Sequence, residues 1–400
     1  MAFNWFEGLG KDSPRLTATT ARIRWPCLCS CSWTRRAIIS YSSPLGRLIP
    51  RPWSKSGQHP GQGRQRDIHM TQKKRIGLIG FFGWGNFGDE LFVDVYRQWL
   101  EPEFELKVLN DLTKKPYFSR PVPEVLEEVD ALVIGGGDLV MPWTVSDLYW
   151  KKEYLEKPVH ICGVGVPTWK GTAAPAVQYM HEFLSHPNIR YFNARDKESA
   201  AWISKHLKPR IEPTNTADIV FALDLPPAPK PKGAPILGVV TRDRADKPDD
   251  LTNVIALCNK AQALGYRIRH IILGSGAVGE RDVARAKDLD IPGKEVIYSD
   301  STMDLCKAIG ECTALTSMKF HGTVVAAAYG VPSFVLSATD KSRNLMRMME
   351  RPDLLSSIAD KHLPDRFSQY TPVIPWATRN LLRRRAESTL NSLIDALRLV

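Results

Sequence analysis

The residues best suited to chemistry are Lys319 and His321, in the segment 316–322 (Thr-Ser-Met-Lys-Phe-His-Gly). This segment joins an apolar run, 312–317, expected to be a buried strand, to a small-residue run, 323–329, expected to be a helix. Ligands of open α/β sheets bind at the carboxyl ends of the strands. A histidine there can exchange a proton near neutral pH, and the lysine could hold an anion beside it. We therefore interpret His321 as a candidate acid–base group, the alternative being a structural histidine at a helix start.

A glycine-rich segment, 81–90, follows the first expected strand, 75–80. Its glycines match the dinucleotide-binding pattern G-x-G-x-x-G at Gly83, Gly85 and Gly88. Asp111 lies near the position expected of a ribose-binding acid. The bulky Trp84 is unsuited to a loop that contacts a pyrophosphate, so a simple glycine turn with Asp89 as helix N-cap is an equal alternative.

Further candidates also follow expected strands. The turn 135–138 (Gly-Gly-Gly-Asp) indicates that a ligand or tightly packed side chains approach the backbone closely. Arg195 and Arg242 each follow a strand, one in each half of the chain. With Lys319 and His321 they could form a cationic ring around one cleft. Such a ring suits a small ligand that carries both a carboxylate and a phosphate, because guanidinium groups bind either one bidentately.

Strand and helix patterns alternate from residue 75 onward, which is typical of α/β folds with parallel sheets. The proline-rich segment 226–235 interrupts the alternation. We therefore expect two Rossmann-like domains, 70–225 and 236–375, facing a central cleft and followed by a C-terminal helix in 376–400. Residues 1–69 show no periodicity, and we expect a disordered leader or an over-extended reading frame with translation starting at Met70. Their Arg- and Ser-rich composition is also that of a transit peptide.

The net charge of +11 does not predict a nucleic-acid partner, because it is concentrated in the leader. Residues 1–69 hold 11 Lys and Arg residues but three Asp and Glu residues, out of 54 and 43 in the whole chain. The rest of the chain is therefore close to neutral.

Cysteine spacing and hydropathy bear on the compartment. The cysteines beyond the leader are scattered among apolar residues without a C-x-x-C pair, at Cys162, Cys258, Cys306 and Cys312. This pattern favours reduced thiols in the cytoplasm over disulfides or a zinc site. No apolar run reaches the roughly 20 residues of a transmembrane helix, and no cluster typical of a divalent-metal site is evident.

The segments described above resemble, in order and spacing, the motifs of the polysaccharide pyruvyl transferases. The resemblance extends over about residues 75–341. It is carried by 85–90 (Gly-Asn-Phe-Gly-Asp-Glu), 135–137 (Gly-Gly-Gly), 195–199 (Arg-Asp-Lys-Glu-Ser), Arg242, 317–322 (Ser-Met-Lys-Phe-His-Gly), 330–332 (Gly-Val-Pro) and Lys341. Two positions depart from the family pattern: Lys319 replaces the usual arginine and Phe320 the usual leucine. A lysine keeps the charge but loses the bidentate fork.

The resemblance implies a glycosyltransferase-B-like fold of two facing Rossmann-like halves. It implies transfer of pyruvate from phosphoenolpyruvate, as co-substrate without a further cofactor, to sugar hydroxyls of a polysaccharide or its lipid-linked precursor. The product is a ketal, and phosphate is released. A lipid-linked acceptor would bring the enzyme to a membrane surface as a peripheral protein.

The site that we predict contains His321 as the acid–base group, with donor-binding and cleft-lining residues around it. The donor-binding residues are Arg195, Arg242, Lys319 and Gly322; the acceptor-binding or cleft-lining residues are Asn86, Asp89, Gly136, Gly137, Asp138 and Lys341. Two alternatives stay open: a glycosyltransferase that uses a nucleotide sugar, and an NAD(P)-binding oxidoreductase.

Overall fold

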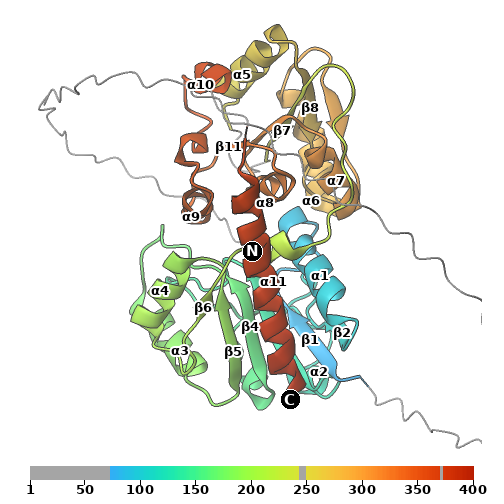
Figure 1. Ribbon diagram of the computed structural model, residues 1–400. Helices are drawn as coiled ribbons and strands as arrows, with labels where there is room; N and C mark the ends of the chain where they lie inside the picture. The colour runs from blue at the N-terminus through green and yellow to red at the C-terminus, as the bar shows by residue number, and fades with distance from the viewer. Residues whose placement is uncertain (1–72, 243–248, 370–372) are drawn as a thin grey trace, which may run out of the picture. The chain divides into compact units, whose positions relative to one another are not determined.

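Two parallel β-sheets organise the part of the chain that the computed structural model describes, residues 73–242, 249–369 and 373–400 (Figure 1). The predicted leader, 1–69, lies outside these residues. The first sheet has the strand order β2-β1-β3-β4-β5-β6 and the second has the order β11-β10-β7-β8-β9. All the strand pairs within both sheets are parallel, as the alternation of strands and helices predicts.

The strands of the first sheet are β1 (Arg75–Ile79), β2 (Glu105–Val108), β3 (Ala131–Gly137), β4 (Val159–Val164), β5 (Ile189–Ala194) and β6 (Thr214–Asn215). The strands of the second sheet are β7 (Ile236–Val240), β8 (Arg267–Ile271), β9 (Glu295–Ile297), β10 (Ala314–Ser317) and β11 (Ser333–Val335). The central strands β3, β4, β7 and β10 are buried along their whole length. This burial explains why they form continuous apolar runs in the sequence.

The helices connect the strands and cover the sheets. In the first half they are α1 (Phe87–Leu100), α2 (Val122–Leu126), α3 (Ala174–Leu184) and α4 (Lys197–Leu207), with the 3₁₀ turns η1 (Lys152–Glu156) and η2 (Ile219–Ala222). In the second half they are α5 (Thr252–Ala263), α6 (Gly276–Arg285), α7 (Thr302–Gly310), α8 (Phe320–Tyr329), α9 (Asp340–Met348) and α10 (Leu363–Gln369), with η3 (Ala286–Asp288) and η4 (Pro352–Leu354). The last helix is α11 (Trp376–Arg398).

Helix α11 returns to the first sheet, where it contacts β4, β5 and η2 (Figure 1). The Tyr191 hydroxyl of β5 donates a hydrogen bond to the Thr389 carbonyl at 3.0 Å, and Lys74 Nζ donates to the Arg398 carbonyl at 2.8 Å. Leu390 and Leu393 are fully buried on the inner face of the helix. Helix α11 thus completes the packing of the first half.

The predicted linker, 226–235, lies against the second half. The Tyr329 hydroxyl donates to the Pro226 carbonyl at 2.7 Å, and Lys230 Nζ donates to the Gly310 carbonyl at 2.6 Å. A hinge in this segment and the domain boundaries on either side of it stay predictions.

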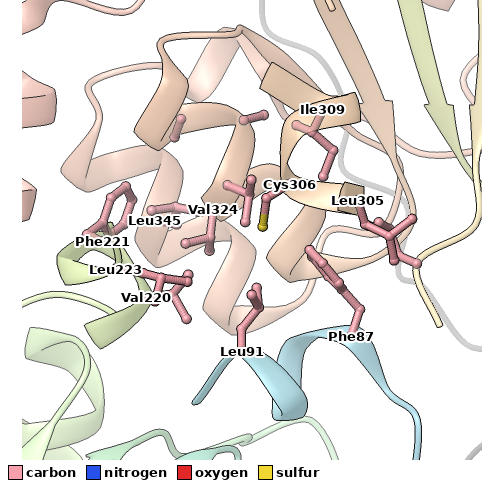
Figure 2. Close-up of a cluster of buried hydrophobic side chains, with 14 of the residues drawn as sticks. Phe87, Leu91, Val220, Phe221, Leu223, Leu305, Cys306, Ile309, Val324 and Leu345 are labelled. Atoms are coloured by element: carbon pink, nitrogen blue, oxygen red, sulfur yellow. The ribbon is translucent and has the colours of Figure 1, made fainter. Parts of the chain in front are cut away.

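An apolar cluster brings helices of both halves together (Figure 2). Phe87 and Leu91 of α1 lie near Val220 and Phe221 of η2 and a set of side chains from the second half (Figure 2). That set comprises Leu305, Cys306 and Ile309 of α7, Val324 of α8 and Leu345 of α9. Burial of this surface fixes α1 against α8, the helix that carries His321.

Candidate active site

The junction between β10 and α8 positions the central residues of the candidate site. Ser317 Oγ accepts a hydrogen bond from the Lys319 amide at 3.1 Å and donates to the Lys319 carbonyl at 2.7 Å, which fixes the turn. The predicted helix start at residue 323 is wrong, because α8 already begins at Phe320. His321 therefore lies in the first helical turn, at the carboxyl end of the strand.

A buried carboxylate faces His321. Asp218 Oδ2 lies 3.5 Å from His321 Nε2, and the Asp218 side chain is only 2% exposed. Burial raises the pKa of Asp218, but the charges of His321 and Arg195 lower it more, so the net pKa is below its usual value. Asp218 is therefore an ionised partner that can orient the imidazole and stabilise its protonated form.

Asp218 is absent from the residues predicted from the sequence. Its local signal is that of a structural cap, because Asp218 Oδ1 accepts from the Val220 amide at 3.1 Å at the start of η2. The position at the junction of the two halves is the one feature of the sequence that could have drawn attention to it.

The other edge of the imidazole packs on the first turn of α1. A Cβ atom added at Gly88 would overlap His321 Nδ1. The Phe92 ring meets the imidazole edge-to-face, with 5.0 Å between ring centroids. Gly88 is therefore required for the approach of His321, not for contact with a phosphate.

Amides of the remaining glycines in this segment are hydrogen-bonded to a side chain of α1, the helix that follows it. Glu90 Oε1 accepts from the amides of Gly83 at 2.9 Å and Gly85 at 3.1 Å, and both glycines have positive φ. These amides are the donors that a pyrophosphate would use, so the G-x-G-x-x-G match has a structural explanation. The prediction of Asp89 as N-cap is wrong: Asn86 holds that position and its side-chain amide donates to Asp89 instead.

Asp89 is an unusual carboxyl group. Burial raises its pKa to about 7, although the Asn86 hydrogen bond and the charge of Lys341 act in the opposite direction. It therefore gains and loses its proton in the range where an acid–base group is useful.

The predicted turn at Gly135–Gly137 is wrong, because these glycines form the end of strand β3, and packing largely explains them. A Cβ at Gly135 would overlap the Cys162 carbonyl and the Tyr96 hydroxyl, and one at Gly136 would overlap Phe92. At Gly137, with φ +94°, the nearest atom to an added Cβ would be Asp89 Oδ1 at 3.6 Å. Of the three glycines, Gly137 alone lies beside the site and has space at the position of a Cβ atom.

Two cations share the carboxylate of Asp138. Arg195 Nη2 donates to Asp138 Oδ1, and Lys341 Nζ lies 2.9 Å from Asp138 Oδ2. Burial raises the pKa of Asp138, but the charges of Arg195 and Lys341 lower it more, far below its usual value. Arg195 is only 3% exposed and also lies 3.7 Å from Asp196 Oδ2, so more than one carboxylate balances the two cations.

Phe320 lies between these cations. Arg195 Cζ is 5.2 Å and Lys341 Nζ is 5.3 Å from the centroid of its ring, within the range of cation–π attraction. We define Asp138, Arg195 and Lys341 as the Asp138 cluster. Phe320, one of the two departures from the family pattern, thus contacts both cations of this cluster.

Lys319 and Arg242 form a separate group in the second half. Lys319 Nζ donates to Asp282 Oδ2 at 2.5 Å and to the Leu273 carbonyl at 2.8 Å. Burial lowers its pKa more than Asp282 raises it, and the nearby charge of Arg242 lowers it further. A Cβ at Gly322 would meet Ser317 Oγ at 2.7 Å, so this glycine is needed for packing.

Two cavities among the described residues lie away from His321. One, of about 270 Å³, is lined by residues of the first half that include Glu90, Asn110 and Asp111. A second, of about 250 Å³, is lined by residues that include Tyr329, Trp376 and Arg379. A cleft at His321 stays a prediction.

The described residues hold no group of three or more His, Cys, Asp or Glu side chains placed to bind a metal ion. None of their helices combines the length and the apolar character that crossing a membrane requires.

Solved structures with the same fold define the class of protein. UDP-GlcNAc 2-epimerase from Neisseria meningitidis, bound to UDP-GlcNAc, aligns with a TM-score of 0.53 at 11% identity, covering 80% of this chain and 100% of the epimerase. The Methanocaldococcus jannaschii epimerase, in complex with UDP-GlcNAc and UDP, gives 0.53 at 10% identity, covering 80% and 99%. The Anabaena protein HepE, in complex with UDP and glucose, gives 0.50 at 11% identity, covering 82% and 100%. The fold is thus glycosyltransferase-B-like, with two Rossmann-like halves.

The sequence narrows this class to one family. The family model for polysaccharide pyruvyl transferase matches residues 86–340, more than half of the chain. Comparison with curated proteins gave no match. The chain belongs to the polysaccharide pyruvyl transferase family and is a transferase.

Proposed function

We propose that this enzyme transfers the pyruvyl group of phosphoenolpyruvate to two hydroxyls of a sugar in a polysaccharide or its lipid-linked precursor, as a ketal. The observation that carries the proposal is the His321–Asp218 pair beside the Asp138 cluster. The pair supplies a proton-transfer group, and the cluster supplies two cations, Arg195 and Lys341, for a trianionic donor.

The reaction requires an acid, a base and an anion site. A proton added to the methylene carbon of phosphoenolpyruvate leaves an oxocarbenium-like centre at the carbon that bears the phosphate. The two acceptor hydroxyls form two C–O bonds to this carbon and lose two protons, and the C–O bond to phosphate breaks. One of those protons replaces the proton delivered to the methylene group, and the other leaves with phosphate.

His321 is our candidate for the proton delivery, with Asp218 stabilising the charged imidazolium. Asp89, with a pKa of about 7, is a second group able to accept a hydroxyl proton. Arg195 and Lys341 would balance the carboxylate or phosphate of the donor. Lys319, Arg242 and Gly322 are kept as donor-binding candidates, and Asn86, Gly136 and Gly137 as acceptor-side candidates.

One alternative draws support from the fold. The epimerases from Neisseria meningitidis and Methanocaldococcus jannaschii bind UDP-GlcNAc on the same architecture, so a nucleotide sugar is the rival donor. The oxidoreductase alternative loses its main support, because Glu90 already accepts from the glycine-loop amides. We place the reaction in the cytoplasm, where the buried free thiols at Cys162, Cys258, Cys306 and Cys312 would stay reduced.

Donor binding separates the two candidates. Calorimetry of the protein with phosphoenolpyruvate, UDP-GlcNAc and UDP should show binding of phosphoenolpyruvate. A glycan acceptor should then release phosphate from it and gain the mass of a pyruvyl ketal. Binding of UDP-GlcNAc with no response to phosphoenolpyruvate would replace our proposal with the alternative.

His321→Ala should lower turnover by about 10²–10⁴-fold, because it removes the proton-transfer group, while donor affinity and melting temperature change little. His206→Ala is the matched control, since His206 stacks on Trp202 in α4, outside the candidate site. If His321 is only structural, activity loss should follow the unfolded fraction. Near-normal turnover in a stable His321→Ala enzyme would exclude His321 as the proton-transfer group.

The position of His321 is tested separately through Gly88. Gly88→Ala places a methyl group where His321 Nδ1 lies, so it should lower turnover and destabilise the fold by about 1–3 kcal/mol. In the His321→Ala background the overlap is absent, and the same substitution should cost almost nothing. Equal destabilisation in both backgrounds would show that Gly88 acts through another contact.

A further inference from the structure

An aromatic surface lies outside the candidate active site, at the carboxyl edge of the first sheet. Trp143 and Trp169 face each other with 5.2 Å between ring centroids and 56° between ring planes. Trp169 is 46% exposed and Trp143 is half-buried. Lys170 Nζ lies 4.9 Å from the Trp169 centroid and 5.7 Å from that of Trp143. We call Trp143, Trp169 and Lys170 the tryptophan platform.

The tryptophan platform is adjacent in the chain to the Asp138 cluster. Trp143 follows Asp138 by five residues after β3, and Trp169 follows the neighbouring strand β4 by five residues. Both segments leave the edge of the sheet where ligands of α/β folds bind.

Hydrogen bonds fix the platform beside this cluster. The amide and hydroxyl of Thr168 both donate to Asp340 Oδ2, at 2.9 and 2.8 Å. Asp340 immediately precedes Lys341 of the cluster. At the other end of the same loop, a Cβ at Gly165 would overlap the Arg195 guanidinium. The loop that carries Trp169 therefore packs closely against Arg195 at Gly165 and is hydrogen-bonded at Thr168 to Asp340, the neighbour of Lys341.

The chemistry of the platform favours a sugar ring. One face of a hexopyranose presents C–H groups, whose partial positive charge matches the negative face of an indole ring. The sugar hydroxyls, or a sugar carboxylate, can accept from the Lys170 ammonium. A cationic ligand is disfavoured because Lys170 already lies over both rings. A planar base held between the two indole rings would need them to be parallel, and their planes meet at 56°.

We infer that the tryptophan platform binds a hexopyranose unit of the acceptor glycan, next to the unit that receives the pyruvyl group. The identification of this glycan as the acceptor rests on the proposed function; the binding of a glycan does not.

Binding is measured on the full chain without phosphoenolpyruvate, so that its outcome is independent of turnover. The probes are defined soluble di-, tri- and tetrasaccharides of neutral and acidic hexopyranoses, titrated by calorimetry. Trp169→Ala and Trp143→Ala should each weaken binding roughly tenfold, the loss expected of one aromatic contact. Trp169→Phe should retain most of the affinity. Trp169→Leu, which keeps apolar bulk but lacks a π face, should lose it.

Trp376→Ala is the matched control, because Trp376 is 68% exposed at the start of α11, and it should bind as the wild type does. Equal binding by wild type, Trp169→Ala and Trp169→Leu would overturn the inference. So would the absence of binding to every oligosaccharide tested, or binding of a nucleotide or peptide in place of sugar. Tryptophan-dependent glycan binding in a protein that does not use phosphoenolpyruvate would leave the inference intact and refute the proposed function.

Discussion

Each half of the molecule buries a carboxylate against cations, but the cations and their exposure differ. In the first half, Asp138 is shared by Arg195 and Lys341, and Arg195 also lies 3.7 Å from Asp196 Oδ2. In the second half, Asp282 accepts from Lys319, which also donates to the Leu273 carbonyl. The first cluster therefore combines a buried arginine with a lysine that is 28% exposed, whereas the lysine of the second half is 14% exposed.

The difference concerns both ligand binding and stability. An anionic donor can reach Lys341, which is 28% exposed, more readily than Lys319, which is 14% exposed. The cations also differ in kind, because a buried lysine can release its proton and an arginine cannot. A cluster built on Arg195 thus depends on its carboxylate more strongly than does a pair built on Lys319.

The largest expected effect is on stability when each carboxylate is removed. Asp138→Asn leaves Arg195 and Lys341 without their shared anion and should lower the free energy of unfolding by about 3–5 kcal/mol. Asp282→Asn should cost less, because Lys319, whose pKa is already lowered, can become neutral. Urea unfolding of both variants makes the comparison. Adding Arg195→Met to Asp138→Asn should recover part of the loss, and a larger cost for Asp282→Asn would contradict the contrast drawn here.

Donor affinity should separate the two lysines by a smaller amount. Lys341→Met removes the more exposed cation of the cluster and should raise the KM for phosphoenolpyruvate by roughly 10–100-fold, as loss of one charged hydrogen bond predicts. Lys319→Met should raise it less, since Asp282 already balances that charge. Lys260→Met, on the exposed face of α5, is the control in phosphate-release assays. A greater effect at Lys319 would place the donor in the second half.

A third effect concerns pH. The pKa of Asp89 is about 7 in the folded chain and about 4 when unfolded, so folding favours its protonated form. This stability is fully present below pH 4 and is lost as pH rises through 7, by up to about 1.4 kcal/mol per unit. Asp89→Asn removes the titrating group. The difference in unfolding free energy between wild type and variant should therefore change across this range. A constant difference from pH 4 to pH 8 would show that Asp89 has an ordinary pKa.

Much of the fold could be predicted because buried parallel strands are recognisable in the sequence as short apolar runs. The run at β7 is apolar along its whole length, those at β1 and β10 are largely buried, and helices separate the strands. The start of helix α6 is harder to predict, because its first turn contains Gly276 and Gly279, which are poor helix formers.

The candidate site was predicted less completely, because its pairings depend on contacts between distant residues. His321 and Lys319 stand out locally, at a strand end. Their partners Asp218 and Asp282 are ordinary acids in the sequence, and only the folded chain brings them within 3.5 and 2.5 Å. That Glu90 accepts hydrogen bonds from the glycine-loop amides could not be predicted either, because an acidic residue is common in the first turn of a helix.

The return of α11 to the first sheet has a consequence for biosynthesis. Leu390 and Leu393, which are buried in the core, are synthesised after the whole second half. During translation, the surface that α11 covers on β4 and β5 therefore stays exposed until the second half has been made. The nascent first half is thus more open to aggregation than the second half and has the greater need of protection by a chaperone.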